Sequence, residues 1–234
     1  MKLKMMIGAA ALAMTAIACS PPAQQEAPAA PAPVAPISVD VPAGDYGLDL
    51  THGSLTWKVN HMGLSNYTAR FAKWDATITF DPANLSASKV VATIDPTSVK
   101  TDYPGDYKKS HAQTGFKSWD EDLAKSDKFF NAGKFPTITF TSTSVETTGE
   151  KTGKVTGDLT FLGVTKPVTL DVTFNGSKNP HPFVPAAAIG FSATGAIKRS
   201  DFGVAFPPGA VGDDVQIVIE GEFIQKVAAP APTK

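Results

Sequence analysis

Apolar and polar residues alternate along eight separate segments of this chain, and this alternation constrains the fold more than any other feature. In the first segment Leu55, Trp57 and Val59 share one phase, while Thr56 and Lys58 occupy the other. A period of two places successive side chains on opposite faces of a β-strand, so each segment predicts a half-buried strand. The segments are 55–61, 74–80, 90–94, one that begins at 138–140, 155–161, 168–174, 189–197 and 215–223.

The connections between most of these segments are short and carry turn residues, such as Asp81-Pro82 and Asn175-Gly176. Eight alternating strands joined in this way predict an all-β fold, an eight-stranded antiparallel barrel that leaves no exposed edge. A sandwich of two sheets gives the same alternation and is the alternative. The barrel domain is expected to span residues 44–226.

One connection, from about 96 to 136, is far longer than the others and lies between the third and fourth strands. Within it Ser118 and Glu121 have capping-box spacing, which predicts a short helix over about 119–128. Phe129-Phe130 follows the helix directly. A helix over one end of a barrel would act as a plug or a lid.

The inward phase of the strands mixes large apolar residues with very small ones. An eight-stranded barrel is just wide enough either to be filled by its side chains or to hold one small ligand. The small residues Ala76, Gly157, Ala193, Gly195 and Gly221 would leave room for a slender cavity, or they would only let the strands bend while aromatic rings fill the centre. If the cavity exists, the expected ligand-binding residues are Trp57, His61, Trp74, Phe80, Phe140, Phe161, Phe191, Ala193 and Phe223.

Residues 1–18 have the form of a bacterial signal peptide. Two lysines precede an apolar stretch that is shorter than the ~20 residues a membrane span needs. The sequence Ala16-Ile17-Ala18-Cys19 resembles the lipobox, in which the signal is cut before a cysteine that carries acyl chains. An ordinary cleaved signal with a free thiol at Cys19 is the alternative.

Residues 19–43 are rich in Pro and Ala, a composition that predicts a semi-rigid tether rather than a folded segment. Ser20 after the cysteine resembles the sorting pattern for the outer membrane. We therefore expect a lipid-anchored protein on the periplasmic face of the bacterial envelope. Residues 227–234 are expected to form a disordered tail.

Several function classes have little support. The net charge of −1 gives no basic field for nucleic acid, and a single cysteine permits neither an internal disulfide nor a Cys-based metal site. There is no Gly-x-Ser-x-Gly elbow and no Gly-rich phosphate loop, so neither catalytic residues nor a cofactor are predicted. Ser110-His111 leaves a hydrolase as the third hypothesis. His52 and His61 would face opposite sides of an unbroken strand, so no metal pair is expected.

Several motifs resemble those of the YceI-like family of bacterial envelope proteins. They include Phe135-Pro136-Thr137-Ile138-Thr139-Phe140, Gly163-Val164-Thr165-Lys166-Pro167-Val168 and Arg199-Ser200-Asp201-Phe202-Gly203. The resemblance covers about 45–226. It implies a lipocalin-like barrel that binds a polyisoprenoid, an isoprenoid quinone or a fatty amide in its interior.

The sequence thus predicts a carrier or sequestering protein for a long apolar lipid, attached to the membrane through Cys19. The alternative is an accessory envelope protein with a filled barrel that docks on a membrane partner. A homodimer is left open. For Arg199, a carboxylate partner such as Asp49 or Asp201 would make its role structural.

Overall fold

The computed structural model describes residues 39–204 and 209–226. The predicted signal peptide, Cys19, most of the tether and the tail lie outside these residues. Within the described ranges, no helix has the length and apolar content that a membrane crossing requires.

Strands dominate the fold, and short helices interrupt them. The strands are β1 (Gly44–Leu48), β2 (Ser54–His61), β3 (Ser65–Phe71), β4 (Trp74–Phe80), β5 (Lys89–Ile94), β6 (Val99–Lys100), β7 (Ile138–Thr147), β8 (Thr152–Phe161), β9 (Val164–Lys178), β10 (Ala188–Lys198) and β11 (Val211–Gln225). The helices are α1 (Tyr107–Ser110) and α2 (Trp119–Lys125), with 3-10 turns η1 (Leu85–Ala87), η2 (Pro96–Ser98), η3 (Ala112–Thr114) and η4 (Arg199–Phe202).

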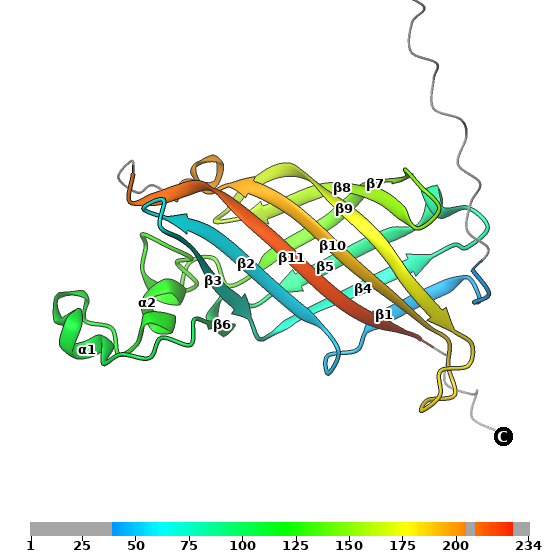
Figure 1. Ribbon diagram of the computed structural model, residues 1–234, viewed down its shortest axis with the longest axis horizontal. Coiled ribbons are helices and arrows are strands. Elements are labelled where there is room, and N and C mark those ends of the chain that lie inside the picture. The colour runs from blue at the N-terminus through cyan, green and yellow to red at the C-terminus, as the bar shows by residue number, and fades with distance from the viewer. Residues whose placement is uncertain (1–38, 205–208, 227–234) are drawn as a thin grey trace, which may run out of the picture. The chain divides into compact units, whose positions relative to one another are not determined.

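These eleven strands lie along eight lines of one antiparallel sheet. β1 and β2 pair with β11 in one continuous direction, since Leu48 faces Phe223 and Ser54 faces Glu220. The strands β3 and β4 continue one another in the same way, as do β5 and β6. Pairing between β1 and β11 closes the ring (Figure 1). The predicted eight-stranded barrel is confirmed, and the two-sheet sandwich is wrong.

One strand line bends between β3 and β4, and the neighbouring line bends between β5 and β6. Ser98 connects the two bends. The backbone N–H of Lys73 donates to Oγ of Ser98 at 2.9 Å, and that hydroxyl donates to the carbonyl of Asp95 at 2.7 Å. Ser98 is buried, so these bonds satisfy a polar group that would otherwise be costly there. Beyond the bend, β6 leads into the long connection that carries the helices.

The predicted helix in the long connection is present but ends three residues early, at Lys125 instead of 128. Ser118 is its N-cap and accepts from the N–H of Glu121 at 3.1 Å. The carboxylate of Glu121 does not close the capping box on Ser118; it accepts from the N–H of Lys117 and pairs with Lys125. Figure 1 shows both helices at one end of the barrel, with α2 beside β3 and β6 and α1 further out.

The last residues of the predicted tether pack on the barrel. Val41 is buried in the same apolar cluster as Tyr46 and Phe80. The hydroxyl of Tyr46 donates to the carbonyl of Pro42 at 2.6 Å, and burial raises the pKa of that phenol. The folded part therefore begins before residue 44.

Candidate lipid-binding cavity

The barrel is hollow. Its interior holds a cavity of about 760 Å³, within the range of ~300–1,000 Å³ that is usual for ligand sites. All nine residues expected from the inward phase lie on its wall: Trp57, His61, Trp74, Phe80, Phe140, Phe161, Phe191, Ala193 and Phe223. That these residues contact a ligand stays a prediction.

Aromatic rings on the cavity wall form two contact groups, and Trp74 and Phe140 line the wall as well. The lid-side group lies near the helices and consists of Trp57, Phe71, Phe130 and Phe161. The far-side group consists of Phe80, Phe174, Phe191 and Phe223. Alanines follow next on the wall, with Ala76 and Ala92 paired across β4 and β5. The small volume of these alanines, and of Ala193 on β10, leaves space for a chain between the groups.

Of the two roles considered for the small residues, making room for a cavity does not apply to Gly157, Gly195 and Gly221. A Cβ at each would come within 3 Å of a neighbouring side chain of the protein itself. The contacts are Phe140 at Gly157 (2.5 Å), Leu170 at Gly195 (2.6 Å) and Phe223 at Gly221 (2.9 Å). None of the three glycines lines the cavity. They allow bulky side chains to lie flat on the wall, so they shape the cavity without widening it.

The long connection covers the helix end of the cavity, as a lid would. Trp119 donates from Nε1 to the hydroxyl of Tyr67 on β3 at 2.8 Å, and Trp119 packs edge-on against Phe129. Phe130 packs against Phe71 with ring centroids 5.4 Å apart. The sequence predicted a helix over one end of the barrel but not these contacts of Phe129 and Phe130. Tyr67 was missed, because β3 was not recognised as a strand.

A buried polar pair holds the helices of the lid together. The hydroxyl of Tyr107 on α1 donates to the carboxylate of Asp122 on α2, and both residues are buried. Burial, together with the hydrogen bond to Asp122, raises the pKa of Tyr107 to about 12. Tyr107 also stacks on His111 and on Trp119, so the lid is a packed unit rather than an open loop.

His61 lies at the rim of the cavity and is exposed. The next residues, Met62 and Leu64, form the exposed apolar tip of the β2–β3 hairpin. The cavity rim therefore adjoins an exposed apolar surface at the β2–β3 hairpin.

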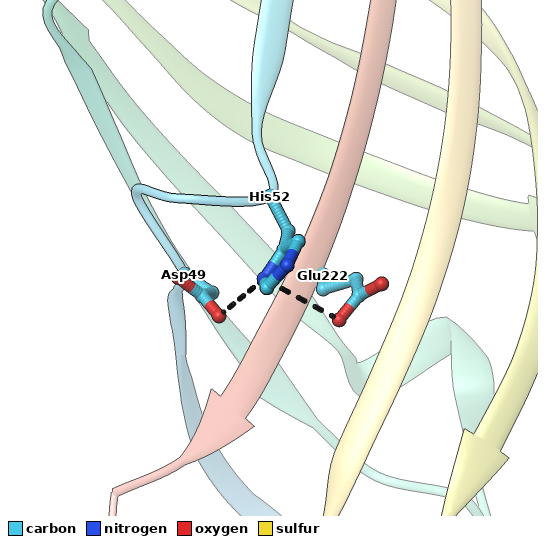
Figure 2. A group of neighbouring side chains, drawn as sticks. All are labelled: Asp49, His52 and Glu222. Atoms are coloured by element: carbon cyan, nitrogen blue, oxygen red, sulfur yellow. Dashed lines mark hydrogen bonds and ion pairs between the residues drawn. The ribbon is translucent and has the colours of Figure 1, made fainter.

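Asp49, His52 and Glu222 form a cluster on the outside of the barrel (Figure 2). Nδ1 of His52 lies 2.9 Å from Asp49 and 4.0 Å from Glu222. The hydrogen bond from His52, with two from Thr51, lowers the pKa of Asp49 to about 2, and Asp49 raises the pKa of His52. Sequence analysis missed this cluster, because the loop 49–53 interrupts the strand and turns His52 toward Asp49.

Asp49 forms an ion pair with His52 and closes a turn with Thr51. Asp49 accepts from both N–H and Oγ of Thr51, so its Oδ1 is already engaged. One imidazolium balances only one carboxylate: His52 pairs with Asp49, while the exposed Glu222 lies 4.0 Å away, and the cluster lies outside the cavity wall. We assign it a structural role at the break between β1 and β2.

Arg199 also has a structural role, through backbone carbonyls. Its Nε, Nη1 and Nη2 donate to Gly212 at 2.9 Å, Val204 at 2.6 Å and Val211 at 3.0 Å. Asp49, one of the partners expected for it, lies beside Glu222 instead, ten positions along the chain from Gly212. The expectation of an Asp49 partner is wrong.

The Ser110-His111 pair is within hydrogen-bond distance, with Oγ and Nδ1 2.8 Å apart. Ser110 Oγ also contacts the carbonyls of Asp106 and Tyr107, which matches a helix C-terminus. Within the described residues, no carboxylate hydrogen-bonds His111, so the group that orients the base in a catalytic triad is missing there.

Comparison with known proteins identifies the family of this chain. Residues 46–223 match the YceI-like domain. The chain belongs to the YceI-like family. It is 38% identical over 186 residues to protein YceI of Escherichia coli O157:H7, which covers 79% of this chain and 88% of that protein.

Solved structures agree with the barrel. BcnA of Burkholderia cenocepacia aligns with a TM-score of 0.61 and 25% identity, over 75% of this chain and 98% of BcnA. A polyisoprenoid-binding domain from Saccharophagus degradans aligns with a TM-score of 0.52 and 17% identity, over 77% of this chain and 98% of that domain. The second likeness shows a shared fold.

Proposed function

We propose that the protein binds one long apolar lipid inside its barrel and carries or sequesters it in the bacterial envelope. The observation that carries this proposal is the apolar cavity of about 760 Å³ along the barrel interior. Membership of the YceI-like family and the fold shared with a polyisoprenoid-binding domain support a polyisoprenoid or a related chain as the ligand. No catalytic step is assigned to the site.

Energetics indicate exchange with a membrane rather than uptake from water. Moving a forty-carbon chain out of water would release roughly 30 kcal/mol at ~0.8 kcal/mol per CH₂, beyond the practical ceiling of about 18–21 kcal/mol for binding. A bilayer solvates the chain about as well as the barrel does, so transfer between them is close to balance. The shape of the cavity and its few polar groups then set selectivity.

Two features suit such exchange. The proposed acyl chains on Cys19 would hold the domain near the bilayer through the Pro/Ala-rich tether. The exposed side chains of Met62 and Leu64 adjoin the cavity rim at His61, where an apolar surface suits contact with lipid. We place the protein on the periplasmic face of the outer membrane on the basis of its N-terminal sequence.

The accessory role with a filled barrel has less support, because the aromatic rings leave the interior open. Native mass spectrometry of the full chain, purified without added lipid, tests the choice. Binding predicts a second species heavier by one lipid, which organic extraction releases. A chain that carries only its anchor, and that takes up no polyprenyl lipid from vesicles, would refute the proposal.

A further inference from the structure

The indole Nε1 of Trp57 is a buried donor without a hydrogen-bond partner. Across residues 39–204 and 209–226, it is the one buried side-chain nitrogen or oxygen in that state. Buried polar groups in folded proteins are nearly always paired, and an unpaired donor is destabilising. Trp57 also lies on the cavity wall, so a group inside the cavity could supply the acceptor.

No acceptor among the described residues lies within hydrogen-bond distance of Nε1. Its nearest aromatic neighbours are Tyr67 and Phe130, each with its ring centroid 6.1 Å away. The hydroxyl of Tyr67 accepts from Trp119 and makes no hydrogen bond with Nε1 of Trp57. On the adjacent strands Trp57 faces Ala69 and Ile217, which have apolar side chains.

We propose that Nε1 of Trp57 donates a hydrogen bond to an uncharged oxygen in the head group of the bound lipid. This inference rests on the proposed function and specifies its ligand as a long chain with a carbonyl-type head. The head then lies beneath the lid, next to Phe130. The tail runs past Ala76 and Ala193 toward the far-side group of aromatic rings.

The charges near Trp57 favour a neutral head over a phosphate. The three guanidinium nitrogens of Arg199 donate to backbone carbonyls. The lysines on the cavity wall, Lys151 and Lys154, belong to the β7–β8 hairpin, at the other end of β8 from Phe161, which packs on Phe130, and Lys154 pairs with Asp171. A phosphate in contact with Trp57 would lie among apolar side chains such as Ala69 and Ile217 and lose most of its hydration, which is strongly unfavourable. A carbonyl oxygen accepts the bond and carries no net charge.

The test compares three probes on the delipidated full chain: a polyprenyl ketone, the polyprenyl hydrocarbon of equal length and the matching polyprenyl phosphate. Trp57→Phe keeps an aromatic ring on the wall but removes the N–H. It should weaken ketone binding about tenfold and leave hydrocarbon binding within about twofold. Trp74→Phe is the matched control, since it removes another indole from the same wall and should affect ketone and hydrocarbon equally.

Proton–nitrogen NMR of the wild-type indoles gives a second readout, independent of the variant's stability. The Trp57 indole signal should shift on adding the ketone and stay in place with the hydrocarbon. The inference is overturned if the Trp57 signal has the same position with the ketone and with the hydrocarbon. That result would be expected if the N–H donates to the face of an aromatic ring of the protein instead of to the ligand. It is also overturned if Trp57→Phe weakens both probes equally, or if the phosphate binds most tightly. Hydrocarbon binding by the wild type would still support the proposed function, whereas no binding of any probe would remove both.

Discussion

Ala193 offers the most direct way to fill the cavity without disturbing the barrel. It lies on β10 between Val172 of β9 and Ile219 of β11, and its side chain lines the cavity. In Ala193→Trp the indole would project into the space where the lipid tail is expected to run. Because that space is open, the new ring should displace ligand rather than overpack the wall.

The size of the effect follows from the apolar contact that is lost. An indole takes the place of roughly five methylene groups, so a long chain loses about 4 kcal/mol of burial, or between 10² and 10³ in affinity. A displacement assay with a fluorescent polyprenyl lipid on the delipidated chain measures this loss. Circular dichroism and thermal unfolding check that the variant keeps its barrel.

Thr194→Trp is the matched control. Thr194 is the next residue on β10, it is exposed, and it does not line the cavity. This variant should bind lipid as the wild type does. If a folded Ala193→Trp protein bound the same lipid with undiminished affinity, the tail would lie elsewhere and the reasoning from the cavity wall would be refuted.

Three further predictions concern the anchor, the lid and the outer cluster. Cys19→Ser should release the protein from membranes or block its processing; unchanged membrane fractionation would contradict the anchor. Phe130→Ala should lower the free energy of unfolding by ~3 kcal/mol and speed lipid release in stopped-flow transfer, because Phe130 packs the lid on the barrel. A variant with normal release would show that the lid does not gate the cavity. Asp49 and His52 should stabilise the fold most between about pH 4 and 6.5, since the pKa of Asp49 is lowered and that of His52 is raised. That contribution is lost as pH falls toward 2 or rises through the folded-state pKa of His52, so His52→Ala should destabilise the protein near pH 5 and have little effect at alkaline pH.

The sequence predicted the barrel because alternation is a local signal. Every predicted strand segment is a strand, and Trp57, Phe140 and Phe223 face the interior as their phase required. The strand β3 was missed, although Tyr67, Ala69 and Phe71 alternate with polar residues in it as in the other strands. β9 and β11 extend to 15 residues each, beyond their apolar runs, since exposed polar positions continue the ladder.

Long-range register limited what could be predicted of the cavity. Whether Gly157 opens space depends on the ring of Phe140 on the neighbouring strand, and no local pattern reveals that contact. The pairing of His52 with Asp49 likewise depends on a loop that breaks the strand line. The unpaired N–H of Trp57 depends on which neighbours lack an acceptor, so it is visible only in the folded structure.

The most direct test is a crystal structure of the chain purified from native membranes without a delipidation step. We predict continuous electron density for one extended chain inside the barrel, from the Trp57 indole past Ala193 to Phe223. An interior that contains only ordered water, or that has collapsed with Phe80 and Phe191 meeting the lid-side rings, would contradict lipid binding.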